Sequence, residues 1–204
     1  MESQTVVSIC CLTYNHELYI EEAINSFLNQ KTSFKFEIII FDDCSTDSTT
    51  QIVNKFKLQY PDLIKIILPQ ENTFSKGKTS FYDLIRASKG KYVACCEGDD
   101  YWISEDKLQA QVDFLENNTG ISICFHPSYT LINNEIIDSQ YGYYGNKPSI
   151  IPAKRVVKSS SGFIPMPSIM IRSNEFRNLF NTYPDFFEKN LWHSTIQIIG
   201  ASYG

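Results

Sequence analysis

Three carboxylates stand within four residues in the run Glu97-Gly98-Asp99-Asp100. The run follows the apolar segment 92–96, which is typical of a buried strand. Mg²⁺ and Mn²⁺ prefer oxygen ligands and usually take one or two carboxylates together with substrate phosphates. The run therefore predicts a metal and diphosphate site. The alternative interpretation is an acidic turn that caps the helix after it.

Two more polar groups follow predicted strands. Thr13-Tyr14-Asn15 comes after an apolar run, and Asp42-Asp43 comes after the next one. The Tyr14 ring could stack on a nucleobase, with loop packing as its alternative role. The Asp43 carboxylate could accept hydrogen bonds from a base or a ribose. For Asp47, a few residues later, helix capping is the favoured interpretation.

Glycines are missing where a phosphate-binding loop would need them. The first glycine of the chain is Gly77, whereas dinucleotide-binding and P-loop folds need glycines directly after the first strand. A nucleotide bound here therefore needs another device for its diphosphate, and a carboxylate-held divalent metal is the one that remains. The three histidines lack metal-ligand spacing, and no GxSxG serine motif is present.

Strand and helix patterns alternate four times in the first part of the chain. Strands are predicted at 6–12, 36–41, 63–68 and 92–96. Helices are predicted from residue 20, after a capping box at 48–51, around 81–85, and after Ser104 as N-cap. This order predicts an α/β fold with a mainly parallel sheet and helices on both faces. Ligands of such sheets bind beyond the carboxyl ends of the strands.

The second part of the chain has a different character. Strands are predicted at 121–125 and 129–132, a long loop at 138–162, and helices at 173–182 and 188–200. Segment 164–171 contains two prolines and is predicted to be an edge strand or extended chain. We expect one domain over 1–204, with halves 1–117 and 118–204. The abrupt end after an apolar run suggests a truncated C-terminus.

Composition narrows the class of protein. The 204 residues are 43% hydrophobic and 20% charged, with a net charge of −5, which argues against a nucleic-acid partner. The six cysteines show no CxxC spacing, so we do not expect a zinc cluster. Cysteines in apolar runs fit a reduced compartment. No leader and no apolar stretch of about 18 residues is evident. We expect a cytoplasmic protein without a transmembrane segment, able to associate peripherally with the inner face of a membrane.

The ordered motifs together resemble a known family. They are the run 7–16, Ser26-Phe27-Leu28-Asn29-Gln30, the run 41–47, and Glu97-Gly98-Asp99-Asp100-Tyr101-Trp102 followed by Lys107-Leu108-Gln109. Over residues 6–116 they resemble the family 2 glycosyltransferases of the GT-A fold that build bacterial capsule and lipopolysaccharide chains. The resemblance implies a nucleotide-sugar-binding half, 1–117, and a smaller acceptor-side half, 118–204.

The resemblance also implies roles for individual residues. It implies a nucleotide-sugar site made of Thr13, Tyr14, Asn15, Asp43, Asn72, Lys78, Glu97 and Asp99. Mn²⁺ or Mg²⁺ would be held by Asp99 and Asp100, with Asp100 the more direct ligand. Glu97 stands where the family often has the first Asp of its DxD motif, and it would support the metal either through water or by contacting the groups that bind the metal.

The catalytic base is the least defined part of the resemblance. The family usually supplies an Asp at the start of a late helix, but no Asp stands in 190–197. His193 is the nearest competent group, with Asp185 and Glu188 as alternatives. The implied reaction moves a sugar from a nucleotide sugar, with a UDP-sugar expected, to a saccharide or lipid-linked acceptor with inversion. A catalytically inactive nucleotide-sugar-binding module and a nucleotidyltransferase are the alternatives.

Overall fold

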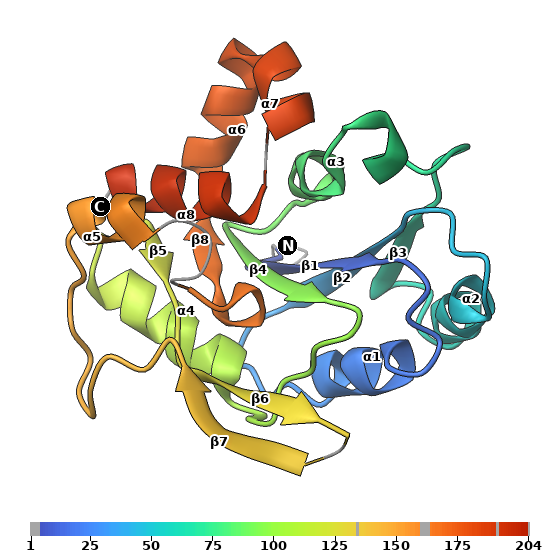
Figure 1. Cartoon of the computed structure of the whole chain (residues 1–204), viewed down its shortest axis with the longest axis horizontal. Coiled ribbons are helices and arrows are strands. Elements are labelled where there is room, and N and C mark those ends of the chain that lie inside the picture. The colour runs from blue at the N-terminus through green and yellow to red at the C-terminus, as the bar shows by residue number, and fades with distance from the viewer. Residues whose placement is uncertain (1–4, 134, 160–163, 191, 204) are drawn as a thin grey trace.

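The protein is described by a computed structural model that covers residues 5–133, 135–159, 164–190 and 192–203. A six-stranded sheet of order β3-β2-β1-β4-β8-β5 forms its centre, and β6 and β7 form a separate two-stranded sheet (Figure 1). The strands of the central sheet are β1 (Val7–Thr13), β2 (Phe36–Asp42), β3 (Ile64–Ile67), β4 (Tyr92–Glu97), β5 (Ile123–Cys124) and β8 (Met170–Arg172). β1 to β4 run parallel, as predicted.

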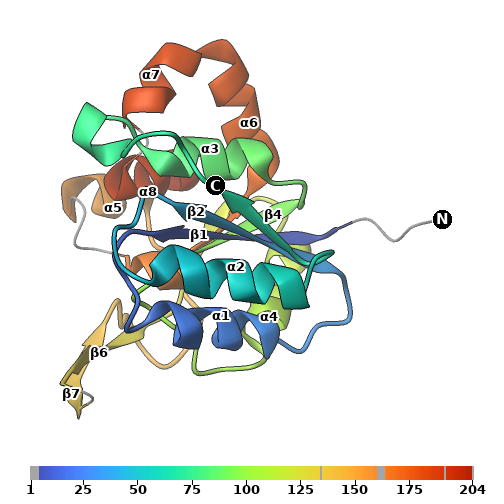
Figure 2. The same ribbon diagram turned by 90° about the vertical axis from the view of Figure 1, so that its right-hand side faces the viewer.

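Helices cover both faces of this sheet (Figure 2). One face carries α1 (Ile20–Leu28), α2 (Thr49–Gln59) and α4 (Lys107–Asn117). The other face carries α3 (Ser80–Ala87), α5 (Ala153–Ser159), α6 (Ser173–Thr182), α7 (Pro184–Asn190) and α8 (His193–Ser202). Each face has its own buried core, because successive strand residues point to opposite sides of the sheet. Ile9 and Cys11 therefore pack in one core and Cys10 in the other.

The order of the strands creates a switch point between β1 and β4. After β1 the chain moves in one direction, through β2 to β3, and then crosses back to place β4 on the other side of β1. Such a reversal leaves a crevice at the carboxyl ends of the two strands. The residues that follow β1 and β4 therefore meet at the predicted site.

Segment 164–171 was predicted to be an edge strand or extended chain, and the edge position is wrong: its last residues belong to β8, while 164–169 lie outside any strand. β8 lies inside the sheet, antiparallel to both β4 and β5. The two prolines are compatible with this position because they precede the strand, Pro165 at the N-cap of a 3₁₀ turn spanning Met166–Ser168 and Pro167 inside it. Neither of them has to donate a ladder hydrogen bond.

The predicted loop at 138–162 is wrong at its start and over 153–159, whereas 142–152 contains no helix or strand and 160–162 lie outside the described residues. β6 (Ser128–Ile132) pairs with β7 (Glu135–Tyr141) to form a hairpin, and α5 follows it. The hairpin carries apolar side chains on exposed surface, so its pattern lacks the alternation that marks a half-buried strand. α5 is short and contributes Val156 to the core.

Two helix boundaries and one predicted capping interaction also differ from the predictions. The helix expected over 188–200 is divided into α7 and α8, because Trp192 between them has an extended backbone. α4 begins at Lys107 after Asp106, not directly after Ser104. Ser48 is the N-cap of α2, but it makes no capping-box bond, and its own N–H donates to the Glu17 carboxylate at 2.8 Å. Within the described parts of the chain, no helix is long and apolar enough to cross a membrane.

Candidate active site

The switch point brings β1 and β4 into close contact through Gly98. Its N–H donates to the Leu12 carbonyl at 2.8 Å. A Cβ added to Gly98 would lie 2.5 Å from Thr13 Oγ1 and 2.9 Å from His16 Nδ1, so only glycine fits here without displacing its neighbours. The glycine inside the acidic run therefore allows the turn after β4 to lie against the end of β1.

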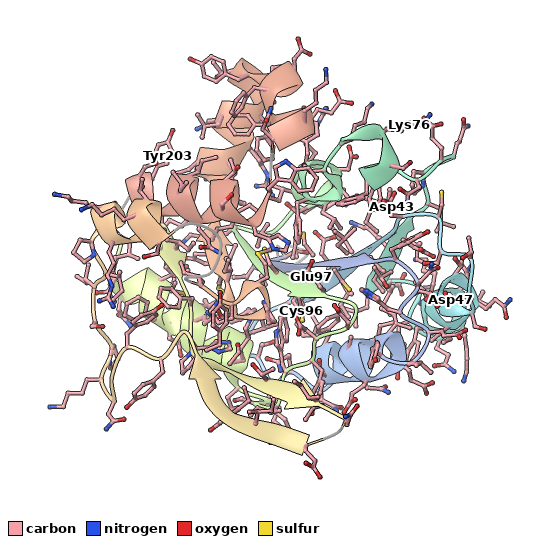
Figure 3. All side chains as sticks on the ribbon, in the orientation of Figure 1. Asp43, Asp47, Lys76, Cys96, Glu97 and Tyr203 are labelled. Carbon is pink, nitrogen blue, oxygen red and sulfur yellow. The ribbon has the colours of Figure 1, made fainter. Side chains whose placement is uncertain are left out.

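The acidic run faces a histidine from the last helix. Glu97 Oε1 lies 3.3 Å from His193 Nε2, and Asp99 Oδ2 lies 3.8 Å from His16 Nε2. Burial, together with the charges of Asp99 and Glu97, raises the pKa of Asp100 to about 7. Burial disfavours a charge on His193, but Glu97 and Asp100 outweigh it and raise the pKa of the imidazole. Figure 3 shows Glu97 near the centre of the molecule, where β4 ends.

These carboxylates fit a metal that is shared with a substrate. Among the described residues, no three His, Cys, Asp or Glu side chains are grouped so that they could hold a metal ion by themselves. Two carboxylates, Asp99 and Asp100, suit a divalent ion that completes its shell with water and phosphate oxygens. Burial is the main cause of the raised pKa of Asp100, followed by the negative charges of Asp99 and Glu97, which a cation bound there would offset.

Asp43 is buried, and its carboxylate orders the loop that follows β3. Its Oδ1 accepts from the N–H and the hydroxyl of Thr73, at 2.6 and 2.8 Å, and its Oδ2 accepts from the Phe74 N–H at 3.1 Å. The Asn72 amide donates to the Asp43 carbonyl at 2.8 Å. Contacts from Asp43 and Asn72 to a base or ribose stay a prediction. Such contacts would use oxygen lone pairs that the protein hydrogen bonds do not already occupy.

The turn after β1 is held just as firmly. Asn15 has a left-handed backbone with φ 55°, and its side-chain oxygen accepts from the Thr46 N–H at 2.7 Å. Its own N–H donates to Ser45 Oγ at 2.9 Å. The Tyr14 side chain beside it is 44% exposed. The turn therefore leaves the Tyr14 ring accessible for stacking, which stays a prediction.

Sequence reasoning gave no role to Asp42, which is fully buried. Its carboxylate accepts from the Ser45 N–H at 3.0 Å and from the Thr50 hydroxyl. Asp47, predicted as a helix-capping residue, accepts from the Thr49 N–H at 2.9 Å, but the N-cap position of α2 is taken by Ser48. The position of Asp42 at the end of a buried strand indicates a buried carboxylate. The sequence interpretation assigned the functional role to the neighbouring Asp43 instead.

The candidates for the catalytic base lie in different places. Glu188 accepts from Lys78 Nζ at 2.6 Å, so the predicted donor residue Lys78 is paired with one of them. Asp185 is exposed at the start of α7. His193 lies beside Glu97 and lines the same cavity as Glu97, Asp99 and Asp100, whereas Asp185 and Glu188 are not among the described residues that line it. The geometry therefore favours His193.

That cavity has a volume of about 1380 Å³ and extends from the acidic run to the β6–β7 hairpin. Its wall includes two buried polar groups that sequence reasoning missed, Lys107 and His126. A signal for Lys107 was present: it is spaced by four and eight residues from Gln111 and Leu115, on the inward face of α4. The His126 side chain had no comparable signal.

Comparisons with known proteins show the family to which the chain is similar. A family model described as Glycosyl transferase family 2 matches residues 8–180. The dTDP-rhamnosyl transferase RfbG of Shigella flexneri is 34% identical over 142 residues, which cover 65% of this chain and 48% of RfbG. The putative glycosyltransferase EpsE of Bacillus subtilis is 31% identical over 183 residues, which cover 88% of this chain and 60% of EpsE. The chain thus spans about half the length of these curated relatives.

Solved structures give the same answer for the fold. The crystal structure of S. aureus TarS 1-349 aligns with a TM-score of 0.70 at 22% identity, over 98% of this chain and 56% of that one. The mannosyltransferase PcManGT from Pyrobaculum calidifontis, in complex with GDP-Man and Mn²⁺, aligns with a TM-score of 0.57 at 17% identity, over 87% of this chain and 47% of that one. The predicted GT-A fold is confirmed.

Proposed function

Because the chain belongs to glycosyl transferase family 2, we propose that this protein transfers a sugar from a nucleotide sugar to a hydroxyl group of a saccharide or lipid-linked acceptor, with inversion. The observation that carries the proposal is the cluster of Glu97, Asp99, Asp100 and His193 at the switch point, on the wall of one large cavity. A UDP-sugar is our first choice of donor, since TarS structures contain UDP and UDP-GlcNAc.

The donor would lie across the ends of β1, β2 and β4. Tyr14 would stack on the base, and Asp43, with the loop it orders, would face the base and ribose. Asp99 and Asp100 would hold the diphosphate through Mn²⁺ or Mg²⁺, which when bound offsets the charge that builds on the departing nucleoside diphosphate. This preorganised frame needs no rearrangement of Asn15 or Asp43, because protein hydrogen bonds already fix them.

His193 would act as the general base. With Glu97 facing Nε2, the neutral imidazole carries its proton on Nε2 and keeps the lone pair on Nδ1. Nδ1 then accepts the proton of the acceptor hydroxyl while the acceptor oxygen forms the new bond to the anomeric carbon and the bond to the diphosphate breaks. Glu97 orients the ring and stabilises the imidazolium that results, as a carboxylate does in hydrolytic triads.

The setting of the reaction is part of the proposal. All six cysteines are free, which suits the reducing cytoplasm. A lipid-linked acceptor would bring the protein to the inner face of the membrane.

The test measures nucleoside diphosphate release from a panel of UDP- and GDP-sugars with Mn²⁺ or Mg²⁺. Asp100→Ala should abolish metal-dependent nucleotide binding in calorimetry, whereas Asp113→Ala, on the exposed side of α4, should leave it unchanged. His193→Ala should lower turnover by about 10²- to 10⁴-fold while nucleotide affinity is kept.

Other outcomes would change the assignment. Normal turnover by Asp100→Ala would reject the metal site, and normal turnover by His193→Ala would reject the base. Donor binding without any turnover would identify an inactive binding module. Pyrophosphate release from a nucleoside triphosphate would identify a nucleotidyltransferase.

A further inference from the structure

The buried ammonium of Lys107 has no carboxylate partner among the residues that the structure describes. The residue is only 5% exposed. Its Nζ lies 3.7 Å from the centre of the Trp102 ring and has no hydrogen-bond partner among the residues that the structure describes. The ring attracts the cation, but an ammonium buried without an anion is unfavourable. A protein that keeps such a group in a cavity wall has a site that is electrostatically incomplete.

His126 lies in the same wall, and one of its two ring nitrogens has no partner among the described residues. Its Nδ1 lies 2.9 Å from the Pro127 carbonyl, which can only accept, so Nδ1 carries the proton. Nε2 is then an acceptor, and it is buried without a partner in the described structure. Burial and the positive charge of Lys107 lower the pKa of this imidazole to about 4, so His126 is neutral near pH 7.

Both groups line the cavity that also contains Glu97 and His193. They come from the start of α4 and from the segment between β5 and β6. In the proposed function the donor lies over β1, β2 and β4, so the part of the cavity toward Lys107, His126 and the hairpin is the part left for the acceptor. The Lys107 stem is flexible enough to turn its ammonium from the Trp102 ring toward this space.

We propose that Lys107 and His126 form an acceptor subsite for an oxyanion that is carried next to a hydroxyl group. The Lys107 ammonium pairs with a phosphate or carboxylate of the acceptor, and His126 Nε2 accepts a hydrogen bond from the neighbouring hydroxyl. The acceptor is therefore a phosphorylated or carboxylated sugar or polyol, not a neutral one. This inference rests on the proposed function for the identity of the bound molecule as the acceptor.

Trp102 provides a signal from inside the subsite. Trp102 and Trp192 are the two tryptophans of the chain, so Trp192→Phe leaves Trp102 as the single indole, in contact with the Lys107 ammonium. Glycerol phosphate, glucuronate and neutral glycerol are titrated at constant ionic strength, with UDP and Mg²⁺ present to occupy the donor site. We expect a saturable change in Trp102 fluorescence with glycerol phosphate or glucuronate and none with glycerol. The tighter of the two anions identifies the oxyanion.

Variants in the same background separate the two groups. Lys107→Met should weaken binding of the anion at least tenfold, while Lys55→Met, which removes an exposed lysine of α2, should not change it. His126→Phe should weaken glucuronate binding but not binding of sulfate, which has no hydroxyl to donate.

The inference fails if Lys107→Met binds the anions as tightly as the parent, or if no anionic probe gives a saturable change. Thermal unfolding of each variant confirms that it is folded at the temperature of the titration. Nucleoside diphosphate release is measured separately on the unaltered protein. If that release is absent, the proposed function fails, while the titration still reports on the subsite.

Discussion

The two sides of the cavity are built in different ways. On the proposed donor side, polar side chains at the strand ends are engaged by protein hydrogen bonds, as Asp42, Asp43 and Asn15 show. On the proposed acceptor side, the β6–β7 hairpin exposes apolar side chains such as Ile132 and Ile136, and its strands pair with each other and not with the central sheet. The donor side is thus fixed by hydrogen-bond networks, whereas the acceptor side has an exposed apolar surface.

This difference fits the two tasks of a transferase. The donor side has to hold a diphosphate and a leaving group in one geometry, and side chains fixed in advance serve that need. The acceptor side would have to admit a second molecule, and Lys107 Nζ and His126 Nε2 have no hydrogen-bond partner there among the described residues. The comparison predicts that donor-side substitutions disturb folding and binding together, whereas hairpin substitutions leave folding almost unchanged.

The largest effect is expected for Asp43→Ala. The substitution removes the acceptor of three hydrogen bonds from Thr73 and Phe74, and bonds to a charged group contribute about 1.5–3 kcal/mol each. Because such losses are not additive, we expect a decrease of about 4 kcal/mol in the free energy of unfolding. Urea denaturation measures it, and calorimetry should show donor binding lost with the loop.

Asp185→Ala is the control, because it removes an aspartate carboxylate at the exposed start of α7. Asp185 is exposed, so its removal should change the free energy of unfolding by less than about 0.5 kcal/mol. Equal effects of the two substitutions would remove the basis for calling the donor side the fixed one.

The donor side was also the more predictable from sequence. Val6 to Leu12 and Phe36 to Phe41 are short apolar runs with polar residues directly after them, so both the strands and the residues at their ends follow from local pattern. The structure placed Thr13 and Gly98 in contact as a consequence. Local pattern did not reveal Asp42 as a scaffold residue, because its partners Ser45 and Thr50 become neighbours only once the turn has formed.

The acceptor side was less predictable because its elements depend on distant pairings. β8 lies between β4 and β5 in the sheet, and its partner residues in β4 are more than 70 residues away in the sequence. No residue in 164–172 indicates this pairing. The proximity of Lys107 to His126 likewise arises only from the fold. Which of the base candidates lies beside Glu97 could not be decided either, because α7 and α8 were predicted as one helix.

The next largest effect concerns the unpaired charge at the cavity. Burial lowers the pKa of Lys107 from 10.5 to about 8, and each pKa unit corresponds to about 1.4 kcal/mol. The folded state therefore gives up this proton at lower pH than the unfolded state does. Between pH 8 and 10.5 the unfolded state binds more protons, so stability should rise with pH across that window, while below pH 8 the penalty is fully present.

Lys107→Met removes this penalty and keeps a side chain of similar length. At pH 7 the substitution should raise the free energy of unfolding by about 2–3 kcal/mol. This range already allows for the lost attraction between the ammonium and the Trp102 ring. The gain should shrink toward zero as pH approaches 10. Urea denaturation of both proteins at several pH values measures the difference between their free energies of unfolding. The contributions of all other titrating groups cancel in this difference, because both proteins contain them. A difference that stays constant with pH would mean that Lys107 is not buried as a charge.

A smaller effect is expected at Gly98. Alanine there would force Thr13 and His16 apart, since its Cβ would lie 2.5 Å from Thr13 Oγ1, and overpacking typically destabilises by about 1–3 kcal/mol. We expect a loss of about 2 kcal/mol together with at least tenfold weaker donor binding, measured by denaturation and calorimetry.

Substitutions at two other glycines test whether the donor and acceptor sides respond independently. Gly200→Ala crowds Ile123 at 2.8 Å on the acceptor side and should destabilise the fold without weakening donor binding. Gly120→Ala meets nothing within 4 Å and should be neutral in both measurements. If Gly200→Ala weakened donor binding as much as Gly98→Ala, the two sides would be mechanically coupled and not separable.

The smallest effect is expected in the hairpin. Ile136→Val and Ile39→Val remove the same methylene group, but Ile136 is 64% exposed and Ile39 is fully buried. A buried methylene contributes about 0.8 kcal/mol or more, so Ile39→Val should lower the free energy of unfolding by about 1 kcal/mol and Ile136→Val by less than about 0.3 kcal/mol. Denaturation with several replicates resolves this difference. A cost at position 136 as large as that at 39 would show that the hairpin is packed in solution, and the acceptor side would then be as fixed as the donor side.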